Sequence, residues 1–161
     1  MPDESRAATP RIVLDTNVCL DLFLFRDPAC APLADALAQG RVQAVVDTAC
    51  RTEWLRVLEY PGVPVRPEQR EGLRGSFDAV MQRLPDLPDP VGLAPLPACR
   101  DPDDQKFLEL ARASGAQWLL SKDRDLLKLA RRTRKAGQFL ILRPDQWSPA
   151  LIGRTLLREA G

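Results

Sequence analysis

Carboxylates at four places in this sequence could perform metal-assisted chemistry: Asp15, Glu53, Asp104 and Asp123. Asp15 directly follows the apolar run Arg11–Leu14, which is typical of a buried parallel strand. Asp123 follows a second such run, Gln117–Ser121. In folds built on parallel sheets, ligands bind beyond the carboxyl ends of the strands. Both aspartates therefore stand where a site is expected, although each could also cap the helix after it.

Glu53 is expected on a helix, with its side chain beside an apolar face. The residues one turn away are Ala49, Cys50 and Val57. The one charged neighbour at this spacing is Arg56. Because burial of an uncompensated carboxylate is costly, Glu53 should have a partner. That partner is either a metal ion or an arginine, such as Arg56, in a salt bridge.

Asp104 has a similarly unusual position on its expected helix. The core-facing residues on its side of that helix are Phe107, Leu108 and Ala111. The nearby Asp101 has a simple role as an N-cap before Pro102, and Asp103 lies over Lys106. Asp104 has no role of this kind beyond a contribution to capping, which makes it a candidate ligand.

Four carboxylates in one crevice would repel one another strongly unless a cation lay between them. Oxygen ligands favour Mg²⁺ or Mn²⁺, and the fitting chemistry is phosphodiester hydrolysis by metal-activated water. The sequence contains no histidine, which excludes Ser-His-Asp and Cys-His catalysis and any histidine-bound metal. Its four cysteines have no C-x-x-C spacing, which argues against a structural zinc site.

The elements that would hold these residues alternate between strand and helix along the chain, which predicts a mainly parallel central sheet in a three-layer α/β/α fold. The expected strands are Arg11–Leu14, Val42–Val46, Gln117–Ser121 and Gln138–Leu142. The expected helices are Val18–Phe25, Pro32–Gln39, Ala49–Glu59, Pro67–Leu84, Asp103–Ser114, Arg124–Arg134 and Pro144–Ala160. The proline-rich segment Pro85–Arg100 should be irregular, with room for one short strand.

With 161 residues the chain has the length of one domain. We expect a single domain over residues 1–161, with its core at about 10–143 and a C-terminal helix at 144–160. A net charge of +1 argues against a large non-specific DNA-binding surface. A local basic patch remains compatible with it. Lys122 and Arg124 could hold substrate phosphates, and the run Arg131–Lys135 could do so too or could simply suit a helix C-terminus.

The polar N-terminal segment lacks the apolar stretch of a secretion signal. No apolar run approaches the ~20 residues that span a bilayer. We therefore expect a cytoplasmic protein without a membrane partner, whose thiols are reduced. The thiols and the three tryptophans are interpreted as core residues, chiefly Trp118 because it lies in an expected buried strand.

Four segments of the sequence resemble the acidic motifs of the PIN-domain ribonucleases, in the order found in that family. They are Leu14–Val18 (LDTNV), Thr52–Leu58 (TEWLRVL), Arg100–Ala111 (RDPDDQKFLELA) and Ser121–Leu127 (SKDRDLL). One such motif alone is weak evidence, because Asp-Thr-Asn is common. Four in order are specific, and the likeness spans roughly residues 11–142.

This resemblance implies an endoribonuclease that is the toxin of a toxin–antitoxin pair. The residues that it implies for Mg²⁺ or Mn²⁺ are Asp15, Glu53, Asp104 and Asp123, with support from Asn17, Ser121 and Asp125. It also implies an RNA substrate, a cognate antitoxin protein and a homodimer. The sequence departs from the family pattern at Lys122, where a small residue or arginine is frequent, and at Cys19 and Asp21, but it keeps all four acidic positions.

Two other functions compete with this one. A catalytically silent PIN-like module that binds protein or RNA is compatible with the same fold. Phosphoryl transfer through an aspartyl intermediate is disfavoured, because Asn17 stands where a second aspartate would follow Asp15.

Overall fold

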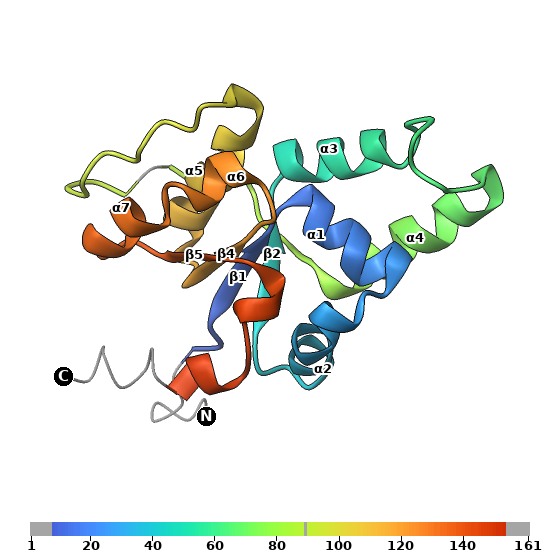
Figure 1. Cartoon of the computed structure of the whole chain (residues 1–161), viewed down its shortest axis with the longest axis horizontal. Coiled ribbons are helices and arrows are strands. Elements are labelled where there is room, and N and C mark those ends of the chain that lie inside the picture. Colours follow the sequence, from blue (N-terminus) through green and yellow to red (C-terminus); the bar gives the residue numbers. More distant parts are fainter. Residues whose placement is uncertain (1–7, 89, 154–161) are drawn as a thin grey trace.

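Five parallel strands form the centre of the molecule (Figure 1). The computed structural model describes residues 8–88 and 90–153. The strands are β1 Arg11–Leu14, β2 Gln43–Val46, β3 Gln82–Arg83, β4 Trp118–Leu120 and β5 Leu140–Leu142. Their order across the sheet is β3-β2-β1-β4-β5, and each adjacent pair is parallel.

Helices cover both faces of this sheet, as the sequence predicts for a three-layer α/β/α fold. Helices α1 to α4 lie on one side of the sheet and α5 to α7 on the other (Figure 1). They are α1 Thr16–Leu20, α2 Ala31–Ala38, α3 Thr48–Val57, α4 Pro67–Val80, α5 Gln105–Ser114, α6 Arg124–Leu127 and α7 Ala130–Lys135. A π-helical turn, Asp21–Phe25, continues α1, and 3-10 turns lie at Pro28–Cys30, Pro102–Asp104 and Pro144–Gln146.

The central strand β1 brings the carboxyl ends of three strands to one edge. Its apolar residues are buried by helices on both faces, which is typical of parallel sheets. Val13 pairs with Val45 of β2 and with Leu119 of β4, so these strands end together. Asp15 stands at this edge, where its N–H donates to the Leu120 carbonyl at 3.0 Å.

The strands predicted at the four apolar runs are confirmed, with ends that differ by at most two residues. The prediction for the end of the helix Pro67–Leu84 is wrong, because α4 stops at Val80 and β3 follows it. The cause is tertiary pairing: the Leu84 N–H donates to the Val46 carbonyl at 2.8 Å, which extends the contact between β2 and β3.

The single helix expected at Arg124–Arg134 is two short helices, because α6 ends at Leu127 and α7 begins at Ala130. Between them the Leu129 N–H donates to the Leu126 carbonyl at 3.0 Å, which is the tighter pattern of a 3-10 turn.

The C-terminal helix predicted at residues 144–160 is wrong at its start. Pro144–Gln146 forms a 3-10 turn and Trp147 is extended. The Trp147 ring packs edge-on against Trp118 at 5.7 Å between centroids, which holds this segment against the sheet. Residues 150–153 are helical, and the rest of that prediction lies outside the described residues.

The core confirms the interpretation of the tryptophans and cysteines. All three tryptophans are at most 2% exposed, and Trp54 stacks on Phe77 of α4 with 4.9 Å between ring centroids. The buried free thiols are Cys19, Cys30, Cys50 and Cys99. Within the described part of the chain, no helix has the length and apolarity needed to cross a membrane.

Candidate metal centre

Asp15 is a buried carboxylate that a serine holds in place. The residue is 4% exposed, and the fully buried Ser121 donates from its hydroxyl to Asp15 Oδ2 at 2.7 Å. Burial raises the pKa of Asp15, and the Ser121 hydrogen bond partly opposes this. The same hydroxyl accepts from the Asp123 N–H at 2.9 Å. Ser121 therefore joins the carboxyl ends of β1 and β4 at one point.

Asp104 is the most strongly perturbed carboxyl of the site. Burial, a hydrogen bond to the Asp123 carboxyl and the charges of Asp15 and Asp123 raise its pKa to about 8. It ends the 3-10 turn before α5, where Phe107 and Leu108 turn into the core as predicted. Its Oδ2 atom is buried and has no hydrogen-bond partner among the described residues. Such an oxygen needs a proton or a cation.

Asp123 is both the cap of a helix and a member of the acidic group. As the N-cap of α6, it accepts from the Asp125 N–H at 2.9 Å. Its carboxyl also faces Asp104. Asp125 itself lies on the first turn of α6, and its charge, like those of Asp104 and Asp123, contributes to raising the pKa of the Cys99 thiol.

Glu53 has a partner, as expected, but the side chain that forms its ion pair is a lysine and not an arginine. Thr16 donates from its hydroxyl to Glu53 Oε2, and the Lys106 ammonium donates to Oε1 at 2.7 Å. The ammonium also donates to the Asp103 carbonyl at 2.6 Å. Lys106 thus links α5 to α3 and neutralises Glu53 at the rim of the site.

The structure brings the four predicted carboxylates into one electrostatic group. The charges of Glu53 and Asp15 interact, as do those of Asp15 and Asp104, and Asp104 contacts Asp123 directly. The predicted supporting residues differ in their roles. Ser121 contacts Asp15 through its side chain, whereas the Asn17 side chain is exposed and only its backbone N–H faces the Asp15 carboxylate.

The donor chemistry of this group fits a hard divalent cation, because every candidate ligand is a carboxylate oxygen. The unpartnered Asp104 Oδ2 supports the same fit. The positions of these carboxylates do not yet form a metal-binding group. Within the described residues, no three histidine, cysteine, aspartate or glutamate side chains are placed to hold a metal ion. Both carboxylate oxygens of Glu53 are already hydrogen-bonded, one to Thr16 and one to Lys106.

Sequence reasoning missed two contacts beside the site. Thr16 and Lys106 hold Glu53, and a pairing across 53 positions of sequence has no local signal. The buried Asp21 pairs with Lys122, with 2.6 Å between Oδ2 and Nζ. Lys122, a candidate phosphate contact, is therefore engaged with the first residue of the π-helical turn, whereas the other candidate, Arg124, is exposed.

Comparison with known proteins supports the fold and identifies the family. A chain in the crystal structure of VapBC2 from Rickettsia felis, bound to a DNA fragment from its promoter, has a TM-score of 0.54 to this chain and 12% identity. That match covers 81% of this chain and 96% of the other, and at this identity it shows a shared fold. No curated protein matches. The family model of the PIN domain matches residues 11–125, from β1 into α6, and the chain therefore belongs to the PIN-domain family.

Proposed function

We propose that this chain is a Mg²⁺- or Mn²⁺-dependent endoribonuclease and the toxin of a toxin–antitoxin pair. The observation that carries the proposal is the Asp104–Asp123 carboxyl pair beside Asp15, with one buried oxygen that has no partner. Without a cation, the repulsion is relieved only by a proton retained on Asp104, whereas a divalent cation would relieve it with the carboxylates ionised. Family membership supports the reading, because PIN domains are generally nucleases.

The residues that would hold the cation are Asp15, Asp104 and Asp123, with Glu53 joining them once it leaves Lys106. When bound, a divalent cation activates water and stabilises negative charge on a phosphodiester. Expected cleavage leaves a 5′-phosphate and a 3′-hydroxyl.

The chain's own residues prepare the site in three ways. Ser121 fixes the Asp15 carboxylate through the 2.7 Å hydrogen bond. Burial and the contact with Asp123 raise the pKa of Asp104 to about 8, so its proton must leave before its carboxylate can act as a ligand. Lys106 keeps Glu53 neutralised through the 2.7 Å ion pair, and its ammonium is a candidate contact for a substrate phosphate.

The direct test is cleavage of a labelled RNA by the purified chain in Mn²⁺. Asp15→Asn and Asp104→Asn should each abolish cleavage, and Mn²⁺ titration followed by calorimetry should show weakened binding in both. Asp103→Asn is the matched control, because Asp103 is exposed and adjacent to Asp104. If both site variants cut as well as the parent, the site assignment fails.

An antitoxin protein, a homodimer and a cytoplasmic location belong to the same proposal. The likeness to a chain of the Rickettsia felis VapBC2 complex supports a protein partner. Co-expression with the product of a neighbouring gene should suppress RNA cleavage by this chain and yield a stable complex. Cleavage that persists in such a complex would contradict the antitoxin role.

One observation favours a second candidate, a catalytically silent module that binds RNA or protein. The Glu53–Lys106 ion pair occupies one of the four carboxylates with a cation that the chain itself supplies. In that case calorimetry would detect no Mn²⁺ binding, and RNA would bind without being cut.

A further inference from the structure

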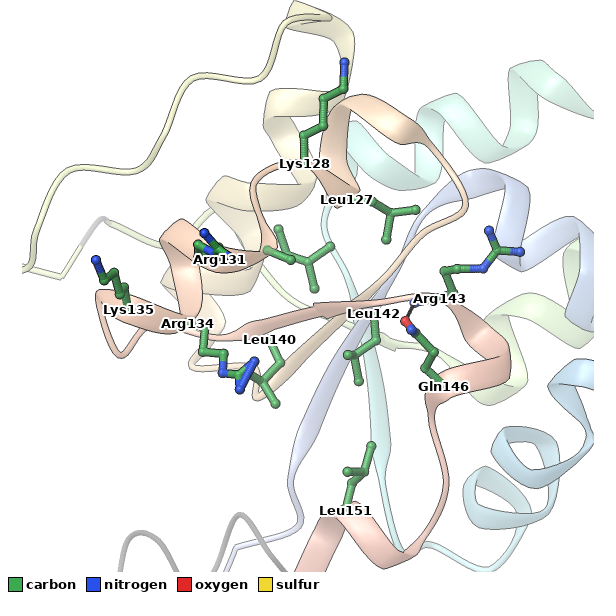
Figure 2. A pocket seen from close by; sticks show the side chains of 12 residues that line it. Leu127, Lys128, Arg131, Arg134, Lys135, Leu140, Leu142, Arg143, Gln146 and Leu151 are labelled. Atoms are coloured by element: carbon green, nitrogen blue, oxygen red, sulfur yellow. Dashed lines mark hydrogen bonds between the residues drawn. The ribbon is translucent and has the colours of Figure 1, made fainter.

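A groove along β5, the edge strand of the sheet, has a composition that RNA hydrolysis does not explain. It has a volume of about 1020 Å³ and lies between α6, α7, β5 and the segment after β5 (Figure 2). Its lining residues are Leu127, Lys128, Ala130, Arg131, Arg134, Lys135, Leu140, Ile141, Leu142, Arg143, Gln146 and Leu151. None of the carboxylates of the candidate metal centre is among them.

The floor of this groove is aliphatic. Leu140 and Leu142 point from one face of β5, and Leu127 of α6 and Leu151 complete the apolar surface. All four are partly exposed rather than sealed in the core. β5 is the last strand of the sheet, so no further strand of the described chain covers this edge. Partly exposed leucines gathered in a groove are typical of a protein-binding surface.

The rim of the groove is basic on several sides. Five of the twelve lining residues are lysine or arginine, and none of the twelve is acidic. Figure 2 shows these cations around the leucines, with Lys128 and Arg143 on different sides. A helix C-terminus favours cations, which accounts for Arg134 and Lys135 of α7. It does not account for Lys128, which precedes α7. Arg143, which follows β5, pairs with Asp145 at 3.2 Å.

The residues that line the groove distinguish among the ligands that a basic surface could bind. Single-stranded nucleic acid binds through aromatic stacking as well as charge, and no aromatic residue lines this groove. A second copy of the chain bound through the same surface would place like charges against each other. An acidic peptide with aliphatic side chains matches both the leucine floor and the cationic rim.

We propose that this groove binds a segment of another protein that contains both leucines and acidic residues, with the aspartates and glutamates lying between the leucines. The leucines would lie against Leu140, Leu142 and Leu151, and the acidic residues would pair with cations such as Arg131 and Arg134. The proposal does not depend on nuclease activity, since it concerns a surface outside the acidic centre.

The test uses a fluorescein-labelled peptide of about 14 residues with leucines at helical spacing and glutamates between them. Its binding to the full chain is followed by fluorescence anisotropy. Two matched peptides replace either the glutamates by lysine or the leucines by serine, and a labelled single-stranded RNA provides the nucleic-acid arm. The parent peptide should bind, and both altered peptides should bind at least about tenfold more weakly.

Charge-reversal variants place the binding on the groove. Arg131→Glu with Arg134→Glu should weaken peptide binding about tenfold. The control, Arg41→Glu with Arg74→Glu, makes the same change of charge at exposed positions outside the groove and should leave binding within about twofold. Leu140→Thr tests the floor with a β-branched residue that suits a strand, and it should weaken binding severalfold.

Several outcomes would overturn the proposal. Equal binding by the groove variant and its control would place the peptide elsewhere. Equal binding of the serine peptide would make the surface a simple cationic patch. Binding of RNA that is lost in the Arg131→Glu, Arg134→Glu variant, without binding of the peptide, would identify a nucleic-acid surface instead.

Discussion

Replacement of Asp104 by asparagine should stabilise the metal-free protein while it abolishes cleavage. The pKa of this carboxyl rises from 3.8 to about 8 on folding, because burial and the charges of Asp123 and Asp15 disfavour its ionised form. At neutral pH the unfolded chain releases the proton that the folded chain retains. Because only the unfolded state gains the free energy of ionising this carboxyl, the free energy of unfolding is lowered at pH 7. A neutral asparagine of the same shape does not ionise in either state and removes this loss.

The magnitude follows from the pKa difference. Each pKa unit corresponds to ~1.4 kcal/mol, and pH 7 lies about three units above the pKa of this carboxyl in the unfolded chain. For a fully buried carboxyl, the free energy of unfolding at pH 7 would therefore be lower by ~4 kcal/mol. Asp104 is only half-buried, and water screens part of this interaction. We expect Asp104→Asn to raise the free energy of unfolding by about 1–2 kcal/mol at pH 7.

The sign of the pH dependence is fixed by the direction of the shift. A carboxyl whose pKa is raised in the folded state contributes its full stability below 3.8 and loses it as the pH rises toward about 8. The gain in the free energy of unfolding that Asp104→Asn produces at pH 7 should therefore be less than half as large at pH 5.

Urea unfolding in EDTA measures this effect, with fluorescence of the three buried tryptophans as the signal. Asp103→Asn, an exposed neighbour, controls for the general effect of losing one negative charge. A destabilised Asp104→Asn, or a gain that is the same at pH 5 and pH 7, would refute the electrostatic reasoning. Mn²⁺ should stabilise the parent and not the variant, by linkage.

Three further substitutions test the contacts around the site and in the core. Ser121→Ala leaves the buried Asp15 carboxylate without its hydroxyl donor, so it should weaken Mn²⁺ binding about 10–100-fold in calorimetry. Lys106→Gln removes the cation that competes for Glu53, so it should lower the free energy of unfolding by about 1 kcal/mol in EDTA yet tighten Mn²⁺ binding. Unchanged Mn²⁺ affinity in either variant would mean that the contact does not control the site. Trp54→Ala should cost about 3–5 kcal/mol in urea unfolding, because this ring is fully buried between helices, and a loss below 1 kcal/mol would contradict its role in the core.

The parts of the fold that depend on local pattern were predictable from the sequence. The apolar run of β1 and the aspartate at its end required no knowledge of other strands. β3 could not be found this way, because two exposed residues become a strand only through pairing with β2. The break between α6 and α7 was missed for a similar reason, since Lys128 and Leu129 suit a helix by composition and the packing on β5 decides the turn.

The candidate site was predictable in its members and not in its contacts. Apolar neighbours on a helix are a local signal, so Glu53 and Asp104 could be singled out as carboxylates that need partners. The identity of the partner depends on which helices meet. α5 passes close to α3 and supplies Lys106, where the sequence suggested a metal ion or an arginine such as Arg56, a residue on the same helix as Glu53.

Net charge illustrates what topology adds to composition. A value of +1 argues against a broadly basic surface, yet the folded chain gathers one acidic group and one basic group in different regions. The acidic group gathers at the carboxyl ends of β1 and β4, and the basic groove lies along α7 and β5. The basic run of α7 is visible in the sequence, but its meaning changes once β5 places leucines beside it. Cations beside an aliphatic floor favour an acidic peptide, whereas the same cations alone would favour a phosphate backbone.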